Sequence, residues 1–146
     1  MDANNNPSRI VLVGDNYRHE EAYAQAALTP GHLVELTATG KVQKHSVAGG
    51  PAECLFAIED ALQGRGINTA YAANELVSLA IPRKGDVVYV WLSGGESADP
   101  SEYLTSNGDG TFKVASSTDI RLLKPLETVD ASDSNDVDER IKARVL

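Results

Sequence analysis

The chain has 146 residues, a single cysteine and a formal net charge of −8 at neutral pH. A chain of this length forms one domain with a core large enough to be stable without disulfides, and one cysteine excludes a disulfide within the chain. The acidic balance argues against nucleic-acid binding, and the longest apolar run is far shorter than the ~20 residues of a membrane helix.

The first 27 residues predict a polar N-terminal arm with a possible short helix. Residues 1–8 are rich in asparagine and too poor in apolar side chains to become ordered without a partner. They also lack the basic and apolar segments of a signal peptide, so we expect assembly in the cytosol. Residues 9–13 predict a short strand, whereas the alanine-rich residues 18–28 fit either a short helix or an extended arm.

Residues 28–126 predict a β-rich core domain. Alternating apolar residues predict a hairpin that turns at Gly40. Residues 54–58 predict a strand, which is followed by one helical turn that ends at Gly64. Cys54 lies among apolar neighbours, so we expect a packed thiol rather than a reactive one.

The densest apolar pattern ends in residues 87–92, with the sequence VVYVWL. This unbroken run of β-formers predicts a strand that is buried on both faces. The run places Trp91 in the core rather than on a ligand-binding surface. Further along, the NGDG sequence at residues 107–110 predicts a hairpin turn that needs positive φ angles.

The C-terminal part predicts a linker and a final strand. Residues 127–139 contain six carboxylates and predict a solvated acidic linker. Residues 140–146 alternate, which predicts a strand that returns to the core through one apolar face. The whole pattern predicts an all-β fold, a small barrel or β-tulip-like domain with one or two short helices and an extended N-terminal arm.

No group of residues in the sequence specifies an active site. The three histidines have no cysteine, aspartate or second histidine at a spacing typical of metal ligands. Alternating oxygen donors at residues 130–138 resemble a calcium loop but lack its glycine and its glutamate. No serine lies in a nucleophile-elbow pattern. We therefore expect neither catalysis nor a cofactor or metal.

Six turn-and-strand phrases occur between residues 28 and 111: LTPGHLVEL (28–36), GKV (40–42), AIEDALQGRGI (57–67), AYAANE (70–75), GDVV (85–88) and LTSNGDGT (104–111). Together they resemble the head decoration, or cement, proteins of tailed bacteriophages. The resemblance extends over residues 28–114 and implies a β-rich tulip or barrel fold that forms homotrimers on the outside of an icosahedral head. It also implies an N-terminal arm that reaches onto the major capsid protein, with no cofactor and no turnover.

The leading hypothesis is a structural virion protein that binds the outside of an assembled phage capsid and stabilises it by clamping neighbouring major capsid subunits. We expect it on the outer capsid surface after assembly in the host cytoplasm, as a homotrimer, with no nucleic-acid or membrane partner. The alternative is a non-catalytic β-sandwich module that binds a sugar or a host surface. The candidate capsid-binding residues are Asn4, Asn5, Asn6, Arg9 and Tyr17.

Overall fold

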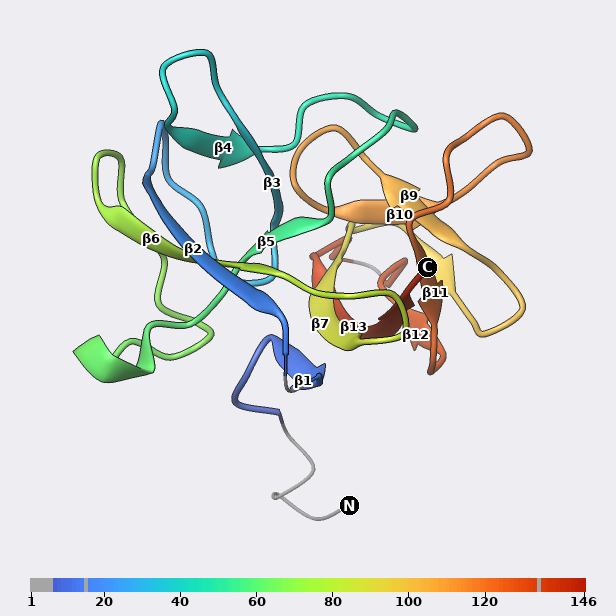
Figure 1. Cartoon of the computed structure of the whole chain (residues 1–146). Coiled ribbons are helices and arrows are strands. Elements are labelled where there is room, and N and C mark those ends of the chain that lie inside the picture. The colour runs from blue at the N-terminus through green and yellow to red at the C-terminus, as the bar shows by residue number, and fades with distance from the viewer. Residues whose placement is uncertain (1–6, 15, 134) are drawn as a thin grey trace.

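The computed structural model describes residues 7–14, 16–133 and 135–146, and almost all regular structure in them is β. Two five-stranded units lie side by side, with β5 and β3 between their cores (Figure 1). The strands are β1 (Val11–Val13), β2 (Arg18–Tyr23), β3 (Leu33–Leu36), β4 (Val42–Lys44), β5 (Leu55–Ala57), β6 (Leu76–Ile81), β7 (Val87–Leu92), β8 (Ser97–Ala98), β9 (Leu104–Ser106), β10 (Phe112–Val114), β11 (Leu123–Pro125), β12 (Val129–Asp130) and β13 (Glu139–Val145).

The first unit is a closed barrel of β7, β10, β9, β11 and β13. The order β7-β10-β9-β11-β13 closes because β13 also pairs with β7, from Glu139 opposite Leu92 to Arg144 opposite Val87. β1 joins the same sheet by pairing antiparallel with β7. The expected small all-β barrel is therefore confirmed.

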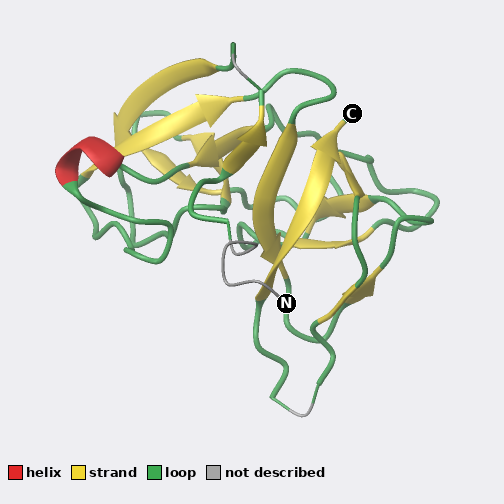
Figure 2. Ribbon diagram, turned by 90° about the horizontal axis from the view of Figure 1, so that it is seen from below, coloured by secondary structure: helices red, strands yellow, loops and turns green. Residues whose placement is uncertain are grey.

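The second unit is a sheet in the order β2-β6-β5-β3-β4. It curls until the end of β2 reaches β4, where an isolated bridge joins Ala24 to Val42. The helical turn η2 (Ala61–Gln63) lies at the outer end of this unit, away from the barrel (Figure 2). It ends at Gly64, whose φ of 72° is left-handed, as the glycine signal predicted.

The strand buried on both faces is β5, not β7. On β5, Phe56 packs into the barrel core against Phe112, with ring centroids 6.1 Å apart, while Leu55 and Ala57 face the second core. On β7 only alternate residues are buried, and Tyr89 and Trp91 are partly exposed. The prediction of a doubly buried strand at residues 87–92, with Trp91 in the core, is wrong. Tyrosine and tryptophan favour strands but keep a polar end that suits a half-exposed face.

The alanine-rich segment at residues 18–28 contains no helix. Its first six residues form β2, which pairs with β6 from Arg18 opposite Ile81 to Tyr23 opposite Leu76. Both alternatives, a short helix and an extended arm, are therefore wrong, because the segment begins with a strand that is part of the second sheet. Pairing with β6 and burial of Ala22 outweigh the helix propensity of alanine.

The C-terminal part is more ordered than a linker followed by a strand. Within residues 127–139, β12 pairs with β8, and Ala131 is fully buried. The final strand is present as β13, which buries Ile141, Ala143 and Val145. The NGDG hairpin is confirmed, because β9 and β10 pair across it.

Candidate docking surface

The five residues expected to bind a capsid are spread over the start of the chain. Asn4, Asn5 and Asn6 lie outside the described residues. Arg9 is exposed, and its Nη2 donates a hydrogen bond of 3.2 Å to the Val11 carbonyl. Tyr17 is partly buried against the barrel core, with its ring 4.6 Å from that of His19. Arg9 is therefore available to a partner, whereas Tyr17 is largely committed to the fold.

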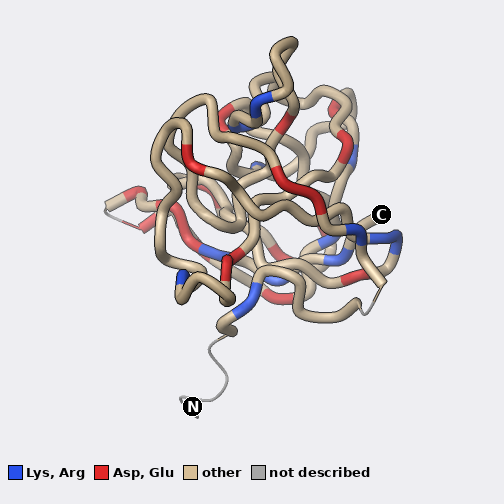
Figure 3. The backbone as a smooth tube through the Cα atoms, turned by 60° about the vertical axis from the view of Figure 1, so that its left-hand side comes forward, with Lys and Arg blue, Asp and Glu red and all other residues tan. Residues whose placement is uncertain are grey.

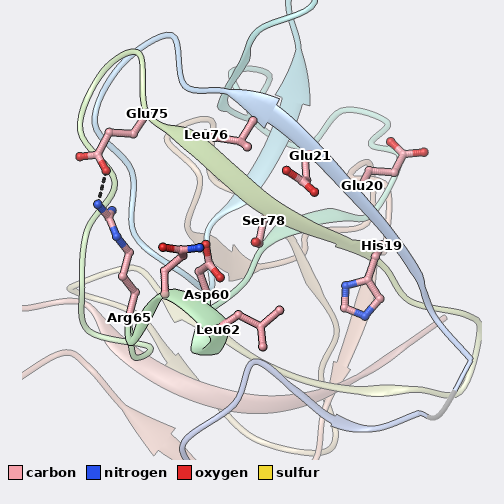
Figure 4. A pocket seen from close by; sticks show the side chains of 10 residues that line it. His19, Glu20, Glu21, Asp60, Leu62, Arg65, Glu75, Leu76 and Ser78 are labelled. Carbon is pink, nitrogen blue, oxygen red and sulfur yellow. Dashed lines mark ion pairs between the residues drawn. The ribbon is translucent and has the colours of Figure 1, made fainter.

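A groove of about 790 Å³ lies on the second unit, between the outer face of β2 and β6 and the turn at residues 60–65 (Figure 4). The sequence alone did not indicate it. Its walls come from three segments that are distant in the chain. The lining residues are His19, Glu20, Glu21, Asp60, Leu62, Gln63, Arg65, Glu75, Leu76 and Ser78.

Strands β2 and β6 form the upper wall of the groove, and their register decides which side chains face it. Residues directly opposite in an antiparallel pair project from the same face, and successive residues alternate. Glu21 lies opposite Ser78, and Tyr23 lies opposite Leu76. Ala22 faces the core instead. This alternation leaves Tyr23 57% exposed and Leu76 44% exposed on the outer face.

The turn at residues 60–65 forms the lower wall. The Asp60 carbonyl accepts hydrogen bonds from the backbone N–H groups of Gln63 and Arg65, which tightens the turn. Leu62 lies in the middle of the turn and is 98% exposed. A leucine this exposed has no packing role within the described chain, so its apolar surface is available to a partner.

An ion pair links the turn to the start of β6. Arg65 Nη2 lies 2.5 Å from a Glu75 carboxylate oxygen, and both side chains are about one-third exposed. Hydrogen bonds from the Ala72 backbone N–H and from Arg65 lower the pKa of Glu75. The same arginine lies over the Tyr71 ring, 5.6 Å from its centroid. The pair therefore holds one end of the groove in a fixed shape.

The groove is acidic apart from that pair. Glu20, Glu21 and Asp60 line it in addition to the paired Glu75, whereas Arg65 is its one lining residue with a permanent positive charge. Carboxylates next to exposed leucines suit a partner surface that offers lysine or arginine beside an apolar side chain. In the described residues, no three His, Cys, Asp or Glu side chains are grouped so that they could hold a metal ion.

Basic residues gather elsewhere on the molecule, beside the C-terminus (Figure 3). Arg83 and Lys84 are exposed in the turn before β7, and the Gly85 N–H donates to the Val145 carbonyl. This turn is part of the barrel unit. This basic pair therefore lies outside the lining of the acidic groove.

His45 and Cys54 have structural roles. His45 is 3% exposed and forms hydrogen bonds to Ser106 Oγ at 2.7 Å and to the Pro51 carbonyl at 3.0 Å. Burial raises the pKa of Cys54 to about 11, which keeps it a thiol at neutral pH. This agrees with the packed thiol expected from the sequence.

No protein-family model matches the chain, and a search of curated proteins finds no similar one. Within the described residues, no helix is long and apolar enough to cross a membrane.

Proposed function

We propose that the protein is a non-catalytic structural protein that binds the outside of an assembled phage head and stabilises it by clamping neighbouring major capsid subunits. The observation that carries the proposal is the acidic groove on β2 and β6, with Leu62 98% exposed at its lower edge. An exposed leucine on a tightly hydrogen-bonded turn is a preformed anchor for another protein. The resemblance to head decoration proteins supplies the kind of partner.

In this proposal the major capsid protein offers a basic, partly apolar loop to the groove. Glu21 and Asp60 face such a loop from opposite walls (Figure 4). Complementary charge raises the rate of encounter and fixes orientation, while burial of Leu62 supplies affinity. Full burial of a leucine contributes about 1.5–3 kcal/mol. That corresponds to roughly a 10- to 150-fold change in binding at one site.

The N-terminal arm provides a second contact. The sequence of residues 1–8 offers asparagine side chains, which both donate and accept hydrogen bonds. β1 ties the following residues to β7 of the barrel, so the arm starts from a fixed point. A homotrimer would present three arms and three grooves to one shell, and linked sites gain effective concentrations in the millimolar range. The location in this proposal is the outer capsid surface, after assembly in the host cytoplasm.

The test uses phage heads assembled without this protein. Wild-type protein, Leu62→Asp and Ile120→Asp are each mixed with these heads, and bound copies are counted by quantitative gel analysis. Ile120 is a matched control because it is also exposed, at 44%, but lies outside the groove, between β10 and β11. We expect Leu62→Asp to lose at least tenfold in affinity and Ile120→Asp to bind like the wild type. Equal binding by both variants would exclude the groove, and no binding by the wild type would refute the proposed function.

A truncation separates the arm from the groove. Deletion of residues 1–8 removes polar side chains that contribute little to a core, so the domain should stay folded and keep its solution mass. We expect fewer bound copies on the same heads, and measured mass by light scattering should correspond to a trimer with or without the arm. Unchanged occupancy would remove the arm from the mechanism and leave the groove as the contact. A monomeric wild-type protein would contradict the trimeric clamp.

A further inference from the structure

Trp91 lies on the outer face of β7, where it meets the second unit. Its indole Nε1 donates a hydrogen bond of 3.0 Å to the Pro30 carbonyl. The Arg140 guanidinium, from β13, lies over the ring with Cζ 4.2 Å from the centroid. The His32 ring is tilted against the indole, with centroids 6.2 Å apart. The indole is therefore held in one orientation, although it is only partly buried.

A small crevice of about 270 Å³ opens beside this indole. It is lined by Thr29, His32, Trp91, Val137 and Asp138. Pockets for drug-sized ligands measure roughly 300–1,000 Å³. The crevice therefore fits one small ring rather than an extended chain.

His32 brings a hydrogen-bond donor to the crevice. The residue is 7% exposed, and its Nδ1 accepts a hydrogen bond of 3.0 Å from the Thr29 backbone N–H. Burial lowers the pKa of His32 to about 4, so the ring is neutral at pH 7. In a neutral ring whose Nδ1 is an acceptor, the proton is on Nε2, which becomes a donor.

His32 Nε2 has no hydrogen-bond partner within the described residues, and it is not fully enclosed by protein atoms. The fully enclosed, unpartnered side-chain atoms there are Thr105 Oγ1 and Arg140 Nε, and His32 Nε2 is not one of them. A ligand or solvent can therefore reach it. A buried donor that is left for a ligand favours one that offers a hydroxyl or carbonyl oxygen.

Asp138 brings an acceptor to the same crevice. One of its oxygens, Oδ1, accepts a hydrogen bond of 2.8 Å from the Gly94 backbone N–H, which orients the carboxylate. The second oxygen is left to accept a hydrogen bond from a ligand. Val137 is 59% exposed beside it and extends the apolar wall that Trp91 provides.

We propose that this crevice binds a single pyranose ring, as a free monosaccharide or as the terminal unit of a glycan. A sugar hydroxyl can accept from His32 Nε2–H while a neighbouring hydroxyl donates to Asp138, and the C–H face of the ring packs against Trp91 and Val137. A neutral ligand is favoured over an acidic one, because the Asp138 carboxylate in the crevice lining repels anions. This inference does not depend on capsid binding.

The test uses the intrinsic fluorescence of Trp91, which is the one tryptophan of the chain and lies in the crevice wall. Full-length protein is titrated with the methyl glycosides of glucose, galactose and mannose and with N-acetylglucosamine, and with glycerol as an acyclic polyol. We expect a saturable change in emission with a millimolar dissociation constant for at least one pyranose and none for glycerol. No saturable change with any of the four sugars would overturn the proposal.

Two variants locate the binding. Asp138→Asn can still accept from Gly94, but it turns an amide N–H toward the ligand hydroxyl where the carboxylate accepted, so we expect at least tenfold weaker binding. Asp133→Asn changes charge equally on the same loop but lies outside the crevice lining, and it should bind like the wild type. Equal affinity in both variants would place the sugar elsewhere and contradict the assignment.

Discussion

The two five-stranded units differ in how they close. In the barrel, β13 pairs with β7 over six successive residue pairs, and the core is filled by large side chains such as Phe112, Leu104 and Ile141. In the second unit, one bridge between Ala24 and Val42 completes the circle. Its core has 10 buried hydrophobic residues, against 18 in the core of the barrel. The barrel is therefore the rigid support, and the second unit leaves an edge strand and a grooved face available for a partner.

The largest expected effect on stability comes from a substitution in β5, which lies between the two cores. Phe56→Ala removes the ring that packs against Phe112 from β5, the strand with residues in both cores. Truncation of a buried phenylalanine costs about 3–5 kcal/mol. We expect a loss of that size in the free energy of unfolding by urea titration, with one cooperative transition. Two separate transitions would show that the units fold independently.

Acidification should weaken the junction through His32. Burial, together with the positive charges of Lys44 and Arg140, lowers its pKa from 6.5 to about 4, and Asp109 partly opposes this shift. The unfolded chain therefore takes up a proton more readily between these pH values. The free energy of unfolding should fall by up to about 3 kcal/mol as the pH drops from 6.5 to 4. The stability that depends on a neutral His32 is therefore present above pH 6.5 and is lost as the pH approaches 4.

The measurement is urea unfolding of wild type and His32→Gln across this pH range. Glutamine does not titrate, so the variant should show a smaller slope with pH. Equal slopes would show that His32 does not carry the pH dependence. The side chains of Asp109 and Glu35, whose pKa values are lowered, contribute mainly below this range.

A smaller effect is expected from Arg140, which joins the two units. Its guanidinium donates to the Pro30 and Ile67 carbonyls and to Asn68 Oδ1, all in loops of the second unit. Hydrogen bonds to charged groups contribute about 1.5–3 kcal/mol each when buried, and less when they are partly exposed. We expect Arg140→Met to lower the free energy of unfolding by about 2 kcal/mol.

Arg144→Met is the matched control, because Arg144 is on the same strand but exposed. It should change stability by less than about 0.5 kcal/mol. If the two variants had the same stability, Arg140 would not be a link between the units, and its contacts would contribute no more than a surface charge.

Local signals in the sequence predicted the elements whose structure is decided locally. The NGDG turn needs left-handed glycines, and Gly108 and Gly110 have φ angles of 84° and 85°. The C-terminal strand follows from strict alternation. By contrast, residues 18–23 have helix propensity but pair with β6, which is more than fifty residues away in the chain. A propensity scale contains no information about that partner.

The candidate site could not be predicted for the same reason. Glu21, Asp60 and Leu62 are ordinary surface residues in the sequence, and only the folding of the second unit brings them to one groove. The apolar run at residues 87–92 led to the wrong prediction that Trp91 lies in the core. Hydrophobicity alone does not distinguish a buried tryptophan from one that lines a crevice. The sequence placed the candidate contact residues in the polar start of the chain, and it did not indicate the groove.

Hydrogen exchange on decorated heads tests the central claim most directly. Exchange of backbone amides is compared between free protein and protein bound to heads, and peptides are resolved by mass spectrometry. We expect slower exchange on binding in β2 and at residues 60–65 of the second unit, and at the N-terminal residues. Exchange in β9, β10 and β11 of the barrel should be unchanged. Protection confined to the barrel strands, with β2 and residues 60–65 unaffected, would contradict the account.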